Sequence, residues 1–172
     1  FTRTHTIKAG KILSFHAKEL ACINKGKLGK DKEFGRVFQL GRIGGNFMIV
    51  LKSTSVMMND KKSFIPLLEE HQAIFGDGVL ERVATDKGYW SSKNKRALTN
   101  LNITVAGLAK PGKLPEGTID LNLKERLHDR RAGIEPLIGH IKRGGQLGKS
   151  RMRSDAATLA AGYGSVLGFN LR

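Results

Sequence analysis

A strand–helix–strand pattern in the middle of the chain constrains the fold most strongly. Residues 79–85 are a strand candidate, residues 92–98 have the composition of a short helix, and residues 103–106 form an apolar run. Two strands joined through a helix run parallel in one sheet, because the crossover returns the chain to the same end. We therefore predict an α/β fold that contains parallel strand pairs.

Upstream of this unit the sequence indicates short strands and loops. Residues 1–11 are polar and basic without an apolar period, so we expect a tail or the end of an upstream connection. A short strand is predicted at residues 12–16, followed by a Lys- and Gly-rich loop at residues 24–32. Two further strand-type runs, residues 34–40 and 46–51, are separated by glycines and should form a hairpin.

Helices are predicted on both sides of the strand–helix–strand unit. A helical period begins at Ser63. It returns strongly over residues 121–143 and more weakly over residues 154–171, after a basic loop rich in Gly and Pro at residues 107–120. The expected architecture is a single domain of 172 residues with a helical C-terminal portion.

The charge balance favours a polyanionic partner. The chain has 30 Lys and Arg against 15 Asp and Glu, a net charge of +15. A membrane surface is the rival partner, yet no stretch approaches the roughly 20 apolar residues of a spanning helix. Nucleic acid is therefore favoured, with a merely soluble basic protein as the alternative. The single cysteine, Cys22, and the lack of a signal peptide in the sequence fit a cytoplasmic protein.

One acidic residue, Asp86, occupies a position where open α/β sheets bind ligands. It follows the predicted strand at residues 79–85 and precedes a turn that contains Gly88. Ligands bind at the carboxyl ends of such strands, and a carboxylate there can reach a metal ion without being buried. The alternative is that Asp86 only favours the turn, as Asp before Lys-Gly commonly does.

A second candidate carboxylate lies in the helical segment at residues 121–143. Its apolar stripe consists of Ile134, Leu137, Ile138 and Ile141. At about 100° per residue, a second face gathers His128, Arg131, Glu135 and Lys142. An ordinary ion pair between Arg131 and Glu135, four residues apart, is the simpler reading of this face. Pro136 also interrupts the hydrogen bonding, so the helix is expected to bend or restart near Gly133.

Several stretches resemble motifs of the DDE-type transposases of bacterial insertion sequences. Two resemble the motifs of the second catalytic Asp and of the catalytic Glu, namely Ala84–Tyr89 (ATDKGY) and Arg130–Lys142 (RRAGIEPLIGHIK). The others are Ser14-Phe15-His16, Lys25-Gly26-Lys27 with Glu33-Phe34-Gly35, and Gly168–Arg172 (GFNLR). The resemblance runs over nearly the whole chain and is specific in combination.

The resemblance implies a ribonuclease-H-like fold, with a mixed sheet and flanking helices. Three carboxylates in this family hold two divalent ions, normally Mg²⁺ and alternatively Mn²⁺, for hydrolysis and strand transfer of phosphodiesters. Asp86 and Glu135 would be two of the three metal ligands and catalytic residues. The implied partners are DNA, at the transposon ends and at the target, and a second subunit in a homodimeric transposition complex.

The resemblance also implies which residues contact DNA. The family pattern Tyr-x2-Arg-x3-Glu-x6-Lys matches Arg131, Glu135 and Lys142, with His128 in place of the Tyr. Arg131 and Lys142 would contact phosphates, and His128 could still donate a hydrogen bond. Four further basic residues are expected to contribute to DNA binding, namely Arg130, Lys149, Arg151 and Arg153.

The first catalytic Asp of the family has no counterpart near the start of the chain. No acidic residue precedes Glu19, so we expect the first Asp and its strand to lie upstream of Phe1 or to have been lost. Asp31 and Asp60 are not expected to replace it, and Asp60 is expected to begin the following helix. The isolated chain should then be inactive or nearly so. The rival functions are a non-enzymatic DNA-binding remnant of a transposase and an unrelated basic RNA-binding protein.

Overall fold

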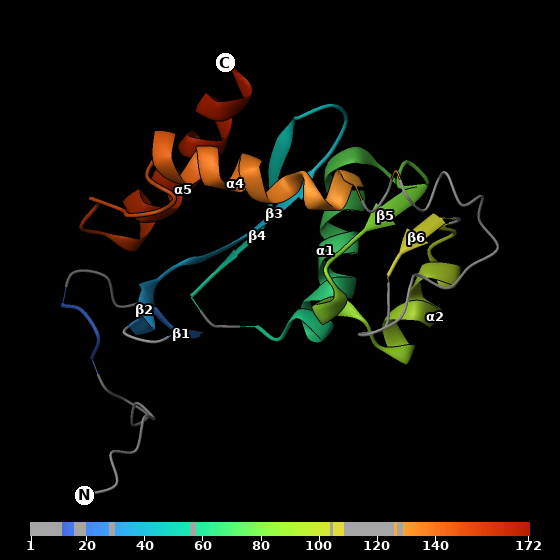
Figure 1. Ribbon diagram of the computed structural model, residues 1–172, viewed down its shortest axis with the longest axis horizontal. Helices are drawn as coiled ribbons and strands as arrows, with labels where there is room; N and C mark the ends of the chain where they lie inside the picture. The colour runs from blue at the N-terminus through green and yellow to red at the C-terminus, as the bar shows by residue number, and fades with distance from the viewer. Residues whose placement is uncertain are drawn as a thin grey trace, which may run out of the picture.

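The computed structural model describes residues 12–15, 20–27, 30–55, 58–103, 105–108, 126 and 129–172. Its central feature is an antiparallel hairpin of β3 (Val37–Arg42) and β4 (Met48–Thr54), as the sequence predicts with slightly different ends. Helices α4 and α5 pack against β3 and β4 through one apolar cluster, and α1 also contacts β4 (Figure 1). The hairpin thereby connects the C-terminal helices to the rest of the fold.

A second hairpin precedes the central one and corrects the sequence prediction. Strands β1 (Ala21–Lys27) and β2 (Lys30–Gly35) pair antiparallel, so the loop expected at residues 24–32 is wrong. Backbone pairing in a two-stranded ribbon tolerates Lys and Gly, residues whose abundance suggested a loop. The strand expected at residues 12–16 is also wrong over residues 12–15, which have no strand structure; His16 lies outside the described residues.

The strand–helix–strand prediction is confirmed. Strands β5 (Arg82–Ala84) and β6 (Val105–Gly107) pair parallel, with α2 (Ser92–Asn100) between them in sequence. Helix α1 (Asp60–Phe75) begins three residues before the predicted helical period, because the Asn59 side chain caps it by accepting a hydrogen bond from the Lys61 backbone N–H. A buried cluster joins α1 to this unit and comprises Phe64, Leu68, Leu98, Ile103 and Leu108.

The C-terminal portion is helical, as predicted, but its first helix is interrupted. Residues 129–132 are helical, Gly133 forms a turn, and α4 (Ile134–Gly144) starts afresh. Pro136 lies in the first turn of α4, where the helix requires no donor from its backbone nitrogen. Helix α5 (Asp155–Asn170) follows and is anchored to β4 by Asn170, whose side-chain amide donates to the Met48 carbonyl at 2.7 Å and accepts from the Met48 N–H at 3.0 Å.

The α/β class is therefore confirmed, whereas the strands within the described residues form three separate two-stranded sheets. One apolar cluster lies between the central hairpin and the helices α4 and α5, and the other lies around α1 and α2. Among the described helices, none combines the length and the apolar character needed to cross a membrane.

Candidate metal and nucleic-acid site

The turn after β5 presents Asp86 to solvent. Asp86 caps the short helix η1 (Lys87–Tyr89), and its Oδ1 accepts a hydrogen bond from the Lys87 backbone N–H at 2.6 Å. Its side chain remains 67% exposed in spite of this contact. The prediction that Asp86 ends a strand at an accessible sheet edge is confirmed, and so is the simpler expectation that it favours the turn.

A contact between distant segments brings Asp86 to the C-terminal helical portion. Arg131 Nη2 lies 3.3 Å from Asp86 Oδ1, although 45 residues separate the two in sequence. The Arg131 side chain is 27% exposed, so this pair is partly shielded from water. The structure therefore unites the two stretches that the sequence singled out, and it directs the Arg131 guanidinium to Asp86.

Arg42 holds the segment before α4 in place. Its three guanidinium nitrogens donate to the Gly45 carbonyl at 2.8 Å, the Asn46 side chain at 2.8 Å and the Arg130 carbonyl at 3.2 Å. A Cβ on Gly133 would lie 2.8 Å from Arg42 Nη1, so glycine leaves the space that this arginine occupies. The central hairpin thus fixes the position of the backbone that carries the Arg131 side chain.

Glu135 follows this break and lies in the first turn of α4, exposed to solvent. A helix N-terminus is a favourable place for a carboxylate because the free N–H groups carry partial positive charge. Lys142 is exposed two turns later, about 10 Å farther along the axis. Gly133 separates the helical residues 129–132 from α4, so Arg131 and Glu135 lie on two successive helical segments, and the predicted restart near Gly133 is confirmed.

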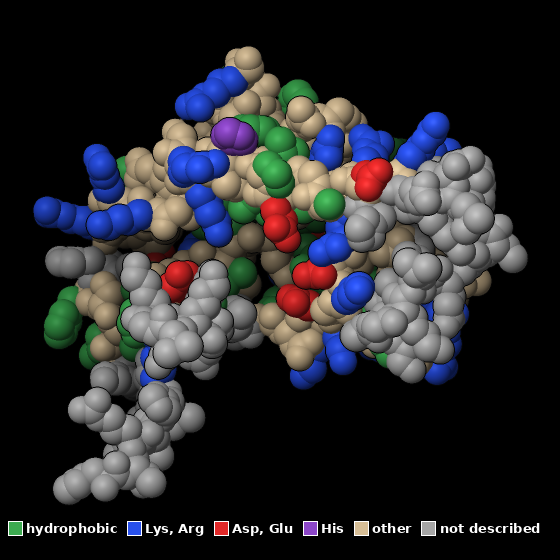
Figure 2. All heavy atoms as spheres, viewed as in Figure 1, with side chains coloured by type: hydrophobic (Ala, Val, Ile, Leu, Met, Phe, Trp, Pro, Cys, Tyr) green, Lys and Arg blue, Asp and Glu red, His purple; other side chains and the backbone are tan. Residues whose placement is uncertain are grey.

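A third carboxylate, Asp60, lies beside the Asp86 turn. A Cβ on Gly88 would approach Asp60 Oδ2 to 2.8 Å, which places the Asp60 carboxylate directly against η1. Partial burial raises the pKa of Asp60, and the negative charge of Asp86 raises it further. Figure 2 shows acidic side chains gathered around a hollow at the centre of this face, with Lys and Arg side chains beside them.

The buried side chain of Asn94 links the start of α1, next to Asp60, to η1, next to Asp86. Its side chain is 1% exposed, and its amide nitrogen donates to the carbonyls of Lys61 at 2.9 Å and Tyr89 at 2.7 Å. Those carbonyls belong to the start of α1, next to Asp60, and to the end of η1, next to Asp86. A single buried amide therefore sets the spacing between the backbones that carry two carboxylates.

Replacing Asp60 with asparagine is expected to stabilise the fold at neutral pH. The pKa of Asp60 is raised in the folded state. The contribution of the Asp60 carboxyl to stability is therefore complete below about pH 4, and it is lost as the pH rises through the folded-state pKa. At pH 7 the variant should melt a few degrees higher than the wild type, and below about pH 4 the two should agree. Thermal unfolding followed by circular dichroism measures both, with the exposed Asp77→Asn as control. A lower melting temperature at pH 7 would contradict the raised pKa that burial and the charge of Asp86 give Asp60.

Three of the remaining predicted DNA-binding residues follow α4. Lys149, Arg151 and Arg153 are exposed in the connection between α4 and α5. This connection is pinned by Gln146, whose side chain accepts from the Arg151 N–H and whose backbone N–H donates to Ser165 Oγ on α5. Arg130 is exposed next to Arg131. His128 lies outside the described residues.

Among the described residues of this region, the candidate metal ligands are carboxylates. Oxygen ligands suit hard divalent cations such as Mg²⁺. Among the described residues, however, no group of three or more His, Cys, Asp or Glu side chains is arranged so that it could hold a metal ion. The described chain therefore offers acidic positions near one another, without a complete ligand set.

Sequence reasoning missed Asp60, Asn94 and Arg42 as parts of this region. The expectation that Asp60 begins a helix is confirmed, but its position beside Asp86 depends on how α1 packs on η1. Asn94 offered one signal, an amide inside a short helix otherwise rich in Lys and Arg.

Comparisons with protein-family models, with curated proteins and with solved structures found no match to this chain. A proposal about its function therefore depends on the residues described above.

Proposed function

We propose that the chain is part of the catalytic region of a DDE-type transposase, which cuts and joins DNA with the aid of divalent metal ions. The observation that carries the proposal is the 3.3 Å contact between Arg131 and Asp86. It joins the two stretches that resemble the family's second-Asp and Glu motifs. A chance pair of weak motifs has no reason to meet in the fold.

The proposed fold is ribonuclease-H-like, with the β3–β4 and β5–β6 pairs as parts of one mixed sheet. Helix α1 contacts both β4 and η1, so it spans the two pairs on one side. Three buried side-chain atoms have no hydrogen-bond partner among the described residues, and two of them, Gln39 Oε1 on β3 and Thr85 Oγ1 after β5, lie on these strand pairs. Buried polar atoms are normally paired. A further strand between β3 and β5 would supply partners, and in this family that strand carries the first catalytic Asp.

Asp86 and Glu135 are the proposed metal ligands, and the donor set fits Mg²⁺ or Mn²⁺ because both are carboxylates. A pair of such ions stabilises the attacking and leaving oxygens of phosphodiester displacement. Arg131 holds Asp86 in place and shields its charge. Asp60 adds negative charge next to Asp86, and the resulting repulsion, which destabilises the chain by itself, is the kind that a bound cation would relieve.

Positive charge provides the proposed DNA contacts. Lys142 lies on α4 beyond Glu135, and Lys149, Arg151 and Arg153 continue from its end. A DNA backbone that runs from the carboxylates along α4 would meet these cations in turn. We propose that the protein acts on transposon ends and target DNA in the bacterial cytoplasm, as a homodimer in the transposition complex.

The DNA-binding part of the proposal is tested by salt dependence. Arg151→Gln combined with Arg153→Gln is expected to lower the slope of log affinity against log salt by about 1.8, because two phosphate contacts are lost. The control combines Lys93→Gln with Arg96→Gln on α2, which removes two exposed charges elsewhere and should change the slope less. Fluorescence anisotropy with a labelled duplex measures both. Equal effects of the two pairs would contradict a contact surface at the end of α4.

A non-enzymatic DNA-binding remnant is the second candidate function. The observation in its favour is that the described residues hold no group of three potential metal ligands. Such a remnant would show the same salt dependence without metal-dependent cleavage of DNA. The two candidates therefore separate on catalysis alone.

A further inference from the structure

The turn that follows β3 orients the guanidinium of Arg42. Its Nε donates to the Gly45 carbonyl and its Nη2 donates to Asn46 Oδ1, both at 2.8 Å. Because a guanidinium is planar, these two hydrogen bonds determine the direction of its third nitrogen. That nitrogen, Nη1, donates to the Arg130 carbonyl at 3.2 Å. The central hairpin therefore presents an oriented donor to a segment 88 residues later in the chain.

Gly133 provides the space that Arg42 Nη1 needs. Its backbone, at φ −69° and ψ −6°, has helical values that every residue type adopts, so the conformation does not require glycine. A Cβ on Gly133 would lie 2.8 Å from Arg42 Nη1. The next nearest atoms, the carbonyl oxygens of Asp129 and Arg130, would be at 3.4 Å and 3.6 Å, which are ordinary contacts. The reason for glycine at position 133 is therefore the Arg42 side chain.

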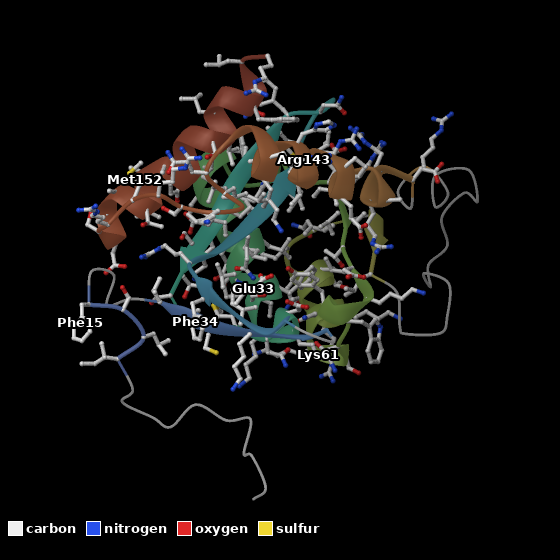
Figure 3. The ribbon with its side chains drawn as sticks, turned by 60° about the vertical axis from the view of Figure 1, so that its left-hand side comes forward. Phe15, Glu33, Phe34, Lys61, Arg143 and Met152 are labelled. Carbon is white, nitrogen blue, oxygen red and sulfur yellow. The ribbon has the colours of Figure 1, made fainter. Side chains whose placement is uncertain are left out.

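Apolar packing by itself does not define where α4 begins. The helix lies across the β3–β4 hairpin (Figures 1 and 3, where Arg143 marks α4 in Figure 3), and its apolar side packs there through Ile134, Leu137, Ile138 and Ile141. Apolar attraction is non-directional, whereas a hydrogen bond weakens steeply as its geometry changes. The hydrogen bond from Arg42 thus selects one position for the backbone that leads into α4.

We propose that Arg42 positions the two proposed metal ligands, Asp86 and Glu135, relative to each other, and that position 133 is glycine because it must leave room for this arginine. The carbonyl that Arg42 holds is followed directly by Arg131, whose Nη2 lies 3.3 Å from Asp86 Oδ1. Glu135 comes after the break, in the first turn of α4. The functional part of this inference rests on the proposed function, whereas the placement of the backbone does not.

Hydrogen exchange tests the placement of the backbone independently of activity. Arg42→Lys keeps the charge but cannot make the three hydrogen bonds of a planar fork. Gly133→Ala displaces the guanidinium, which is the flexible end of a side chain, so the helix itself should still form. We expect each variant to speed amide exchange over residues 129–138 by about tenfold, as the loss of one hydrogen bond allows. Mass spectrometry of peptides from this segment measures the change.

The two substitutions should not have additive effects. Once Arg42 is replaced, Gly133→Ala has no guanidinium to displace, so the double variant should exchange no faster than Arg42→Lys. Two controls lie in the same part of the fold. Arg36→Lys removes a hydrogen bond of 3.0 Å to Ser53 Oγ, and Gly44→Ala adds a Cβ that meets nothing within 4 Å. Neither control should change exchange over residues 129–138.

The metal requirement tests the functional part in the protein that the full reading frame encodes. Arg42→Lys and Gly133→Ala keep both carboxylates but loosen their spacing, so the Mg²⁺ concentration for half-maximal DNA cleavage should rise by at least about tenfold. Saturating Mg²⁺ should restore much of the rate, and the two controls should match the wild type.

Two results would overturn the proposal. One is exchange over residues 129–138 that neither Arg42→Lys nor Gly133→Ala alters, and the other is an active enzyme in which both variants keep the metal requirement of the wild type. A wild type that cleaves no DNA contradicts the proposed function instead, and hydrogen exchange then decides whether Arg42 places the segment.

Discussion

Alanine in place of Asp86 or Glu135 is expected to abolish Mg²⁺- or Mn²⁺-dependent DNA cleavage by the protein that the full reading frame encodes. Each carboxylate is a proposed ligand of the same metal site, and in-line displacement depends on both ions being held. The loss should be at least about a thousandfold in rate. Nicking of a supercoiled plasmid that carries the element's end, followed with and without metal ion, measures the effect.

Controls distinguish loss of chemistry from loss of structure. Asp77→Ala and Glu70→Ala remove exposed carboxylates elsewhere, in the turn after α1 and on α1 itself, and should retain activity. Circular dichroism should show that the Asp86 and Glu135 variants fold, since both side chains are exposed. Cleavage that persists in either variant would show that the assignment of catalytic residues is wrong. A folded wild type that binds DNA without cleaving it would favour the DNA-binding remnant.

Arg131 should behave differently from the two carboxylates. Arg131→Gln removes the partner of Asp86 but leaves every proposed metal ligand in place. If Arg131 only positions Asp86, the variant should need a higher metal concentration for half-maximal cleavage, and excess metal should restore part of the rate. If Arg131 also contacts the DNA phosphates, affinity for DNA should fall and become less dependent on salt.

Much of the fold follows from local sequence signals. Two strand-type runs separated by glycines predict the central hairpin, and the strand–helix–strand pattern predicts the parallel pair β5–β6. The restart of the helix at Gly133 also follows, because Pro136 is tolerated only in a first turn. In each case the signal and the structure it specifies lie within a short stretch of chain.

Composition misled the prediction at residues 24–32. The abundance of Lys and Gly suggested a loop, whereas the segment pairs with its neighbour as β1 and β2. Strand preference depends on the surroundings more than helix preference does, and a narrow ribbon needs only one partner strand. No periodicity distinguishes such a ribbon from a loop.

The candidate site was predictable only in part, because its geometry depends on packing. Asp86 and Glu135 follow from motif and position, but the contact between Asp86 and Arg131 requires that α4 and the turn after β5 approach each other. Arg42 determines that approach from the central hairpin, through a hydrogen bond to the Arg130 carbonyl 88 residues away. The position of Asp60 likewise depends on the packing of α1 against η1. Contacts of this range leave no local signal.

Asn94 is expected to be among the most sensitive positions in the chain. Replacing it with alanine leaves the Lys61 and Tyr89 carbonyls without their donor in a buried place, which should lower the free energy of unfolding by about 3 kcal/mol. Asn94→Asp has nearly the same shape but puts an oxygen where the donor was. It should therefore lower the free energy of unfolding more than Asn94→Ala does at neutral pH. Urea unfolding followed by circular dichroism measures both changes.

The pH dependence of Asn94→Asp separates the buried amide's hydrogen bonds from its packing. Burial beside two carbonyl oxygens would raise the pKa of the new carboxyl, so the variant should recover part of its stability as the pH falls and the acid becomes a donor. Asn100→Asp, an exposed change near the end of the same helix, should cost well under 1 kcal/mol and serves as the control. If Asn94→Asp were no worse than Asn94→Ala at pH 7, Asn94 would not hold the turns of Asp60 and Asp86 together by its hydrogen bonds.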